Sequence, residues 1–162
     1  MNTRTITRGE AVESIKALIS QFSNGQEYDL ATLGDVVHAV NKDVQVRDYL
    51  LGVPSEYPNL SIAQFADFIN SLFAFIGVQD TVPFSTILGA FYFECERNQE
   101  ARESLALALS QNKNYSLANL LARVMLAGWI PSEFTQMRSK LHSKVIAHLA
   151  ETANEEVGSD NE

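Results

Sequence analysis

Apolar residues recur along the chain at intervals of three and four positions, which is the spacing of one face of an α-helix. Two segments carry the pattern most clearly: Val12, Ile15, Leu18, Ile19 and Phe22, and later Leu117, Leu120, Leu121, Val124 and Met125. No segment alternates apolar and polar residues over more than four positions, as a half-buried strand would. The sequence therefore predicts an all-α fold, a bundle of about seven or eight amphipathic helices.

Short sequence signals mark where these helices begin and end. Residues 7–10 and 61–64 each place a Thr or Ser three positions before a Glu or Gln, which is the capping-box pattern. Pro83 is expected in the first turn of a further helix, where its missing N–H costs nothing. Gly128 is expected to end the helix that carries Leu117 to Met125.

Phenylalanine is concentrated in the middle of the sequence. Seven of the nine Phe lie between residues 65 and 93, so two helices there, about 61–77 and 83–95, are apolar on nearly all sides and are expected to be buried. Their apolar runs are shorter than the roughly 20 residues that cross a bilayer. We therefore predict that this pair forms a protein core and that the chain has no membrane partner.

Changes in composition divide the chain into four parts. Residues 53–60 hold two of the four Pro and are expected to link an N-terminal helical subdomain, residues 1–52, to a helical core, residues 61–151. Five carboxylates and no Lys or Arg follow from residue 151 onward. We expect residues 152–162 to form a disordered acidic tail, because such a segment cannot bury enough apolar surface to offset the entropy of ordering.

Charge and cysteine content limit the classes of partner and the cellular compartment that we expect for this protein. The formal charge is −8, of which residues 151–162 carry −5, so residues 1–150 carry only −3. This acidic balance argues against a nucleic-acid partner, and the basic flank of Arg138, Lys140 and Lys144 is interpreted as a solvated helix face. A single cysteine, Cys95, and no visible signal peptide after Met1 indicate a cytoplasmic protein.

Residue patterns typical of catalysis, metal binding or cofactor binding are missing from the sequence. His142 and His148 are six positions apart, roughly 240° around a helix, which is too far to share a metal. Cys95 lies between Glu94 and Glu96, which raises the pKa of a thiol rather than activating it. We predict no catalytic, metal or cofactor-binding residue.

Two clusters of polar residues are candidates for a functional site. Four carboxylates with Arg97 and Arg102 surround the junction between two helices, and the simplest interpretation is a solvated junction with ion pairs three or four residues apart: Glu94, Glu96, Glu100 and Glu103. A second group would assemble a site from residues dispersed along the sequence, which is the enzyme alternative: Asp35, His38, Arg47 and Asp48.

Part of the chain resembles a known family. The matching residues are helix-packing positions: Ala101, Leu105–Leu109, Tyr115–Ala118, Leu120–Leu121 and Gly128 to Pro131, with Val46–Asp48 and Leu50–Leu51 upstream. They resemble the C-terminal helical part of the actinobacterial domain of unknown function 4192 family. Two turns, at residues 97–99 and 113–114, depart from its pattern, and its N-terminal α/β portion is missing. The resemblance implies a helical fold and a host range of actinobacteria and their phages, and it supplies no catalytic residues.

The same stretch, residues 97–131, also looks like a tetratricopeptide hairpin, with two amphipathic helices and small Ala residues at their crossing. No second copy follows at the 34-residue offset of that repeat. A single hairpin cannot form the groove of a repeat array, so this likeness predicts a helical hairpin near the C-terminus and no more.

These observations favour a non-enzymatic cytoplasmic interaction or regulatory protein that acts through a helical surface on a protein partner. The alternatives are a phage-type inhibitor that binds a host protein, including by acidic mimicry, and the enzyme with a dispersed site. Trp129 follows a helix-ending glycine, where it either covers the helix ends or anchors a partner. Trp129, Tyr115 and Arg123 are the predicted interaction residues, and the oligomeric state stays open.

Overall fold

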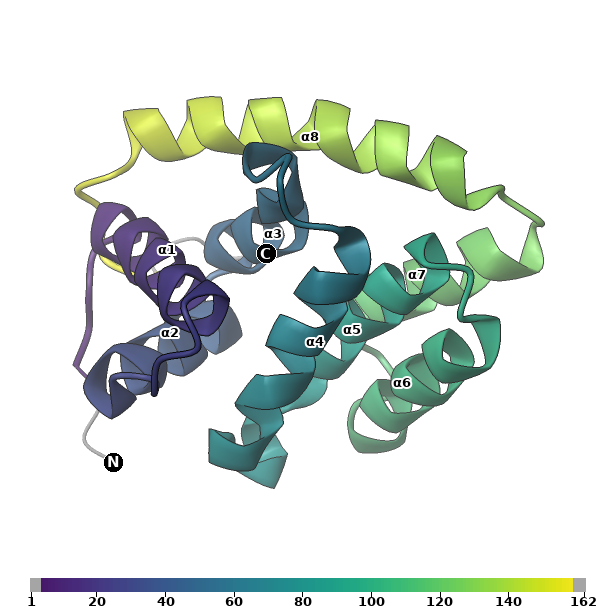
Figure 1. The fold of residues 1–162 in the computed structure, drawn as a ribbon, viewed down its shortest axis with the longest axis horizontal. Helices are drawn as coiled ribbons and strands as arrows, with labels where there is room; N and C mark the ends of the chain where they lie inside the picture. The colour runs from purple at the N-terminus through teal and green to yellow at the C-terminus, as the bar shows by residue number, and fades with distance from the viewer. Residues whose placement is uncertain (1–3, 159–162) are drawn as a thin grey trace. The chain divides into compact units, whose positions relative to one another are not determined.

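A computed structural model describes residues 4–158 of the chain, and every regular element in this range is a helix (Figure 1). The eight α-helices are α1 Arg8–Ser23, α2 Leu30–Lys42, α3 Val44–Gly52, α4 Ile62–Leu72, α5 Val82–Glu94, α6 Asn98–Gln111, α7 Ser116–Leu126 and α8 Pro131–Glu151. Three short 3-10 helices accompany them: Val53–Glu56, Phe73–Phe75 and Val78–Asp80. The predicted all-α fold of seven or eight helices is confirmed.

The chain forms two compact units. Unit 1 contains the residues up to Val53 together with those from Leu141 onward, and unit 2 contains Pro54–Lys140. The predicted division after residue 52 lies beside the first of these boundaries. The last helix was expected to lie wholly within a core of residues 61–151, but residues 131–140 of α8 belong to unit 2 and residues 141–151 to unit 1.

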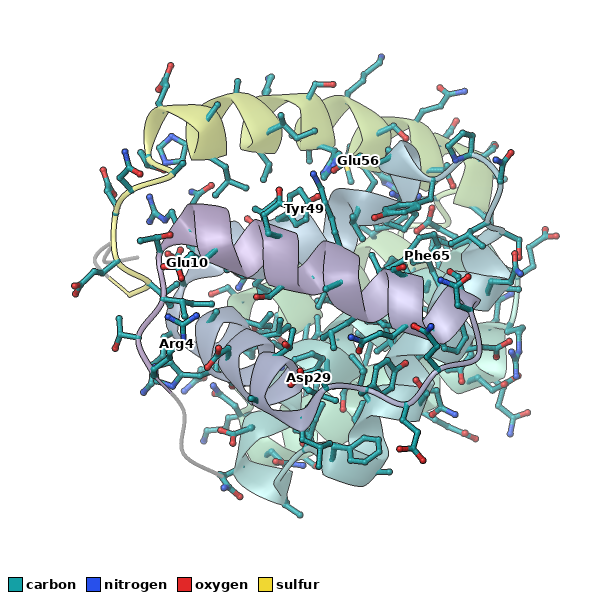
Figure 2. The ribbon with its side chains drawn as sticks, turned by 60° about the vertical axis from the view of Figure 1, so that its left-hand side comes forward. Arg4, Glu10, Asp29, Tyr49, Glu56 and Phe65 are labelled. Carbon is teal, nitrogen blue, oxygen red and sulfur yellow. The ribbon has the colours of Figure 1, made fainter. Side chains whose placement is uncertain are left out.

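Local sequence accounts for the start of α1. The Thr7 hydroxyl accepts a hydrogen bond from the Glu10 N–H, and the Glu10 carboxylate accepts one from the Thr7 N–H, both at 3.1 Å. The predicted capping box is therefore present, and the hydrogen bond from the Thr7 backbone lowers the pKa of Glu10. Arg4 forms ion pairs with Glu10 at 3.3 Å and with Asp35 at 3.4 Å, and Figure 2 shows Arg4 beside this end of α1.

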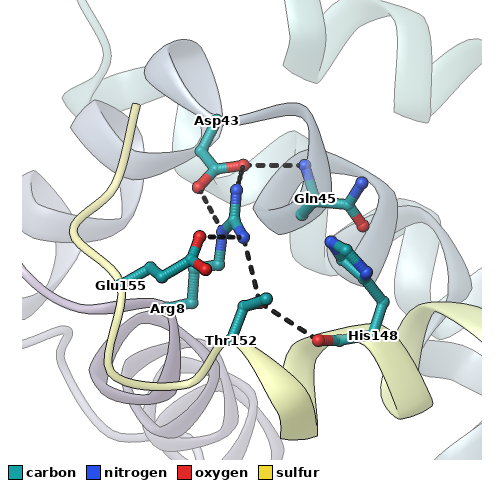
Figure 3. A network of polar contacts seen from close by, with 6 residues as sticks. All are labelled: Arg8, Asp43, Gln45, His148, Thr152 and Glu155. Atoms are coloured by element: carbon teal, nitrogen blue, oxygen red, sulfur yellow. Dashed lines mark hydrogen bonds and ion pairs between the residues drawn. The ribbon is translucent and has the colours of Figure 1, made fainter. Parts of the chain in front are cut away.

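A fully buried arginine holds unit 1 together (Figure 3). Arg8 Nε lies 2.7 Å from a carboxylate oxygen of Asp43, and both side chains are completely inaccessible to solvent. Its Nη1 donates to the Thr152 hydroxyl at 2.9 Å and to the Glu155 carboxylate at 3.0 Å. Asp43 also caps α3 by accepting from the Gln45 N–H at 2.9 Å. A buried charge needs such partners, because removing it from water without them costs several kcal/mol of folding free energy.

The segment after α8 packs against the start of α1. The first N–H groups of a helix have no partner within it; here Arg8 N–H donates to the Glu155 carbonyl at 3.0 Å and Gly9 N–H to the Ala153 carbonyl at 2.9 Å. Val157 donates its N–H to the Ile6 carbonyl at 3.0 Å, and its side chain is buried. The expected disordered tail, residues 152–162, is therefore wrong as far as residue 158, and residues 159–162 lie outside the described range.

Gly52, the last residue of α3, leaves space for a side chain of α8. A Cβ atom at this position would lie 2.2 Å from Nδ1 of His142. His142 is buried, and its ring centroid lies 5.3 Å from that of Tyr49, also on α3. Glycine therefore allows the imidazole to pack directly on the α3 backbone within unit 1.

Helix α5 is the centre of unit 2. Every residue from Val82 to Phe91 is buried, and α5 packs against α4, α6 and α7. Phe91 contacts Phe65 of α4 with ring centroids 6.2 Å apart. The predicted capping box at Ser61 and Gln64 is present, and Pro83 occupies the first turn of α5. The Phe-rich pair is thus the core of this unit, as the sequence predicts.

Three details of the expected helices are different in the structure. Helix α4 ends at Leu72 rather than near residue 77, and a 3-10 turn follows it. Leu120, which belongs to the apolar face predicted for residues 117–125, is 46% exposed. Arg138 was interpreted as part of a solvated flank, but it is buried and forms a two-pronged ion pair with Glu94 at 2.8 Å. Among the described residues, the longest helix is too polar to cross a bilayer.

Candidate functional site

A hollow in unit 2 lies along the α6–α7 hairpin. It has a volume of about 490 Å³, and nine of its twelve lining residues are apolar. We call this site the α6–α7 groove; it is lined by Phe93, Glu96, Asn98, Arg102, Leu105, Ala106, Leu109, Ala122, Met125, Leu126, Trp129 and Pro131. Volumes of this size and an apolar lining with few polar groups are typical of binding sites.

Exposed apolar side chains continue from the groove onto the turn after α7. Leu126 is 88% exposed, Ile130 56% and Trp129 38%. A single exposed apolar residue is ordinary on a protein surface, but a contiguous group beside an apolar hollow marks an interaction site. Apolar surface therefore extends over both the groove and its border.

The end of α7 determines where Trp129 lies. Gly128 has φ +78°, and its N–H donates to the Met125 carbonyl at 3.2 Å while the Trp129 N–H donates to the Val124 carbonyl at 3.4 Å. These two hydrogen bonds form a Schellman motif, whose left-handed position favours glycine. The motif reverses the chain sharply, so that Trp129 is directed back toward the groove formed by its own helix.

The end of α5 uses the same motif with a different residue. Glu96 N–H donates to the Phe93 carbonyl at 3.0 Å, and Arg97 N–H donates to the Tyr92 carbonyl at 2.9 Å. Glu96 occupies the left-handed position, with φ +63°, and is the one non-glycine residue with positive φ in the described part of the chain. This conformation costs a non-glycine residue about 1–2 kcal/mol. A strained residue at the border of a pocket is a reason to look for a role there.

Two opposite charges border the groove without being paired. Glu96 and Arg102 are exposed and form no ion pair or hydrogen bond through their side chains with any residue of 4–158. Neighbouring charges behave differently, because Arg97 pairs with Glu100 and Glu94 is buried against Arg138. The expected solvated junction is therefore correct for Arg97 and Glu100, but Glu94 is a buried structural carboxylate and Glu96 belongs to the groove.

The structure separates the three predicted interaction residues. Trp129 lines the groove, whereas Tyr115 and Arg123 are not among its lining residues. Tyr115 is half-buried at the N-terminal end of α7, and its carbonyl accepts from Asn119. Arg123 is exposed in the last turn of α7.

Three of the four residues in the dispersed polar group of the enzyme alternative are engaged in ion pairs. Asp35 pairs with Arg4, and Arg47 pairs with Asp48 at 2.9 Å. None of these residues, nor His38, lines the groove. Within residues 4–158, no three His, Cys, Asp or Glu side chains converge as metal ligands.

Cys95 is not poised for nucleophilic chemistry. Burial raises the pKa of its thiol, and the nearby Glu94 carboxylate raises it further. The predicted direction of this shift is therefore confirmed, with burial as its main cause. A thiol that stays protonated at neutral pH is a poor nucleophile and a poor metal ligand.

Comparisons of the chain with protein-family models, with curated proteins and with solved structures found no match. The resemblance of residues 97–131 to the actinobacterial family therefore stays a prediction.

Proposed function

We propose that the chain is a non-enzymatic, cytoplasmic interaction protein whose α6–α7 groove binds an amphipathic helix of a protein partner. The observation that carries this proposal is the combination of an apolar groove of about 490 Å³ with two unpaired, opposite charges at its border, Glu96 and Arg102. A hydrophobic hollow alone could fill with any apolar side chain. The two charges give the site an orientation and a selectivity.

The chemistry of the groove specifies its partner. Helices that bind in apolar grooves present side chains at positions i, i+3 or i+4, and i+7 along one face. Such a face would fill the space between Leu105, Leu109 and Met125, and Trp129 would cover its edge. We expect an acidic residue of the partner beside Arg102 and a basic residue beside Glu96, because complementary charges fix the register of a docked helix.

Other observations weigh against the alternative functions. The carboxylates of the dispersed polar group, Asp35 and Asp48, are each held by an arginine. Acidic mimicry of nucleic acid needs free carboxylates in a regular array, whereas Asp43 and Glu94 are buried in ion pairs. Neither the enzyme alternative nor acidic mimicry accounts for the apolar groove.

A peptide selection tests the proposal. A library of displayed helical peptides is selected on the parent protein and counter-selected on Ala106→Trp, a change at an exposed lining residue that fills the groove. The recovered peptides should share apolar residues at helical spacing, one conserved acidic position and one conserved basic position. Ala63→Trp, the same change on the exposed surface of α4, should bind these peptides like the parent.

Charge reversal then tests the orientation. Arg102→Glu should change the preferred peptide residue at the conserved acidic position from acidic to basic. The reason is that the charge at the border of the groove, which this peptide residue faces, has changed sign. Failure to recover any peptide that distinguishes the parent from Ala106→Trp would contradict the proposal. Concentration-dependent self-association in sedimentation, lost in Ala106→Trp, would instead identify a second copy of this chain as the occupant.

A further inference from the structure

A second pocket, with a larger share of polar residues in its lining, lies on the opposite side of α6 from the groove's lining residues. It has a volume of about 290 Å³ and shares no lining residue with the α6–α7 groove. Residues of α4, α5 and α6 and of the turn after α4 form it, and we call it the α4–α6 pocket. Its apolar wall is made by Phe73, Leu88 and Leu107, while its polar groups include Ser85, Glu100 and Glu103.

Ser85 in this pocket has a hydroxyl that the fold does not use. Its side chain is buried, with 1% of the residue exposed, and its Oγ has no hydrogen-bond partner in the described part of the chain. The adjacent Thr86 is equally buried, but its hydroxyl donates to the Val82 carbonyl at 2.8 Å. A buried hydroxyl without a partner costs folding free energy. An unpaired hydroxyl at a pocket wall therefore points to a partner that is not part of the chain.

The charge of the pocket indicates which kind of partner. Two carboxylates, Glu100 and Glu103, line it, and no Lys or Arg does. Glu100 is paired with Arg97, whereas Glu103 accepts only from the Gln99 amide, at 3.0 Å. Glu103 thus has no cationic partner among residues 4–158, and the charged side chains that line the pocket are both anionic.

Tyr92 supports the same conclusion. Burial raises the pKa of its phenol, so that the group stays neutral and adds no charge to the lining. The Arg97 guanidinium lies over the Tyr92 ring, 4.6 Å from its centroid. Arg97 is therefore held on this ring and on Glu100, which leaves Glu103 as the free anion of the pocket.

We propose that the α4–α6 pocket binds a primary alkylammonium group. An ammonium carries three N–H donors and no acceptor, which suits a carboxylate, a hydroxyl and further oxygen acceptors. It would donate to Glu103 and to Ser85, and its alkyl chain would lie against Phe73, Leu88 and Leu107. The same chemistry is presented by a small free amine and by the lysine side chain of another protein. This site is independent of the function proposed for the groove.

A set of matched probes tests the charge requirement. The full chain is titrated with n-butylammonium chloride, with n-butanol and with sodium butyrate at constant ionic strength, and backbone amide shifts are followed by NMR. The ammonium should give saturable shifts at the lining residues of α5 and α6, while the alcohol and the carboxylate should not. Equal responses to ammonium and alcohol, or no saturable response, would overturn the proposal.

Two substitutions test the assigned partners. Glu103→Gln and Ser85→Ala should each weaken n-butylammonium binding by about tenfold, as expected for a hydrogen bond to a charged group. Ser85→Ala should leave the protein at least as stable as the parent, because it removes an unsatisfied hydroxyl. Thr86→Val removes a satisfied buried hydroxyl beside it, and Glu133→Gln removes an exposed carboxylate elsewhere in unit 2; neither should change the affinity.

The outcomes separate cleanly. Unchanged affinity in both Glu103→Gln and Ser85→Ala would overturn the assignment, and Glu103→Gln decides alone if Ser85→Ala does not fold, because Glu103 is exposed. A blocked tripeptide, acetyl-Gly-Lys-Gly-amide, distinguishes the two sources of the ammonium. Saturation at the same residues would support a protein lysine as the ligand, whereas binding of butylammonium alone would support a small free amine.

Discussion

Glu96 and Gly128 occupy equivalent backbone positions, but only Glu96 combines a strained backbone with a charged side chain at the groove. Both occupy the left-handed position of a Schellman motif, with φ +63° and +78°. Gly128 adopts this conformation without strain, whereas Glu96 has a Cβ that disfavours it. Glu96 nevertheless places a free carboxylate at the border of the α6–α7 groove. The strain at this residue is consistent with selection for what its side chain binds rather than for stability.

Replacing Glu96 should therefore separate stability from binding. Glu96→Gly should raise the free energy of unfolding by roughly 1 kcal/mol, because the strain of the left-handed conformation is removed. The same variant should bind a partner's basic residue less tightly, since the rim charge is lost. Gly128→Ala is the matched control and should lower stability by a similar amount. Urea unfolding measures both changes, and a Glu96→Gly protein less stable than the parent would contradict this interpretation.

The buried ion pair between Glu94 and Arg138 gives a second prediction about single residues. Their side chains are 1% and 6% exposed, and removing one partner of such a pair leaves an uncompensated charge that costs about 3–5 kcal/mol. Glu94→Gln should therefore lower the unfolding midpoint of the protein strongly. Arg97→Gln breaks a pair that is largely exposed and should leave the midpoint nearly unchanged. Equal effects of the two variants in thermal unfolding would contradict the assigned burial.

At the level of elements, local signals in the sequence identify the helices well. Capping boxes at Thr7 and Ser61, Pro83 in the first turn of α5 and Gly128 after α7 all act within a few residues, so each can be seen in the sequence. Contacts between distant residues leave no such signal. Arg8 and Asp43 are 35 positions apart and Arg8 and Glu155 are 147 apart, so their pairing depends on how the helices pack.

The candidate site was predictable in part for the same reason. Trp129 could be found because it follows a helix-ending glycine. Glu96 and Arg102 lay in a recognised cluster of charges, but which charges pair depends on whether Arg138, far along the chain, reaches Glu94. The left-handed position of Glu96 has no such signal, because Asp43 and residues 112–115 also join helices without a glycine and have negative φ.

The packing of α8 on α3 tests a contact between elements of unit 1. Gly52→Ala places a Cβ 2.2 Å from His142 Nδ1, and overpacking of this kind typically costs about 1–3 kcal/mol. In a His142→Ala background the same substitution should cost much less, because the obstructing ring is gone. A double-mutant cycle by urea unfolding measures this coupling. Identical costs of Gly52→Ala in the two backgrounds would mean that the ring moves aside freely.

At the level of the whole molecule, the two ends of unit 1 are mutually dependent. The first turn of α1 has unpaired N–H groups, and carbonyls of Ala153 and Glu155 accept from two of them. In return, Arg8 holds the segment after α8 through Thr152 and Glu155, and the Ile6 carbonyl accepts from the Val157 N–H. The acidic composition of this segment, which predicts disorder when it is considered alone, is compensated by a buried cation about 147 positions earlier. Composition is a guide to disorder only where no such partner exists elsewhere in the chain.

Truncation should reveal this dependence. Deleting residues 154–162 removes the Glu155 ion pair, the hydrogen bonds of Arg8 and Val157 to the backbone, and the buried Val157 side chain. Burial of a valine alone contributes about 1.5–3 kcal/mol, and Arg8 would also keep its burial against Asp43 with fewer donors satisfied. The free energy of unfolding should therefore fall by roughly 2 kcal/mol or more. A chain ending at Gly158 retains these contacts and should unfold at nearly the parent midpoint. Equal stability of the two truncated chains in urea unfolding would show that the segment contributes nothing to the free energy of unfolding. Val157→Ala would then leave the stability unchanged as well.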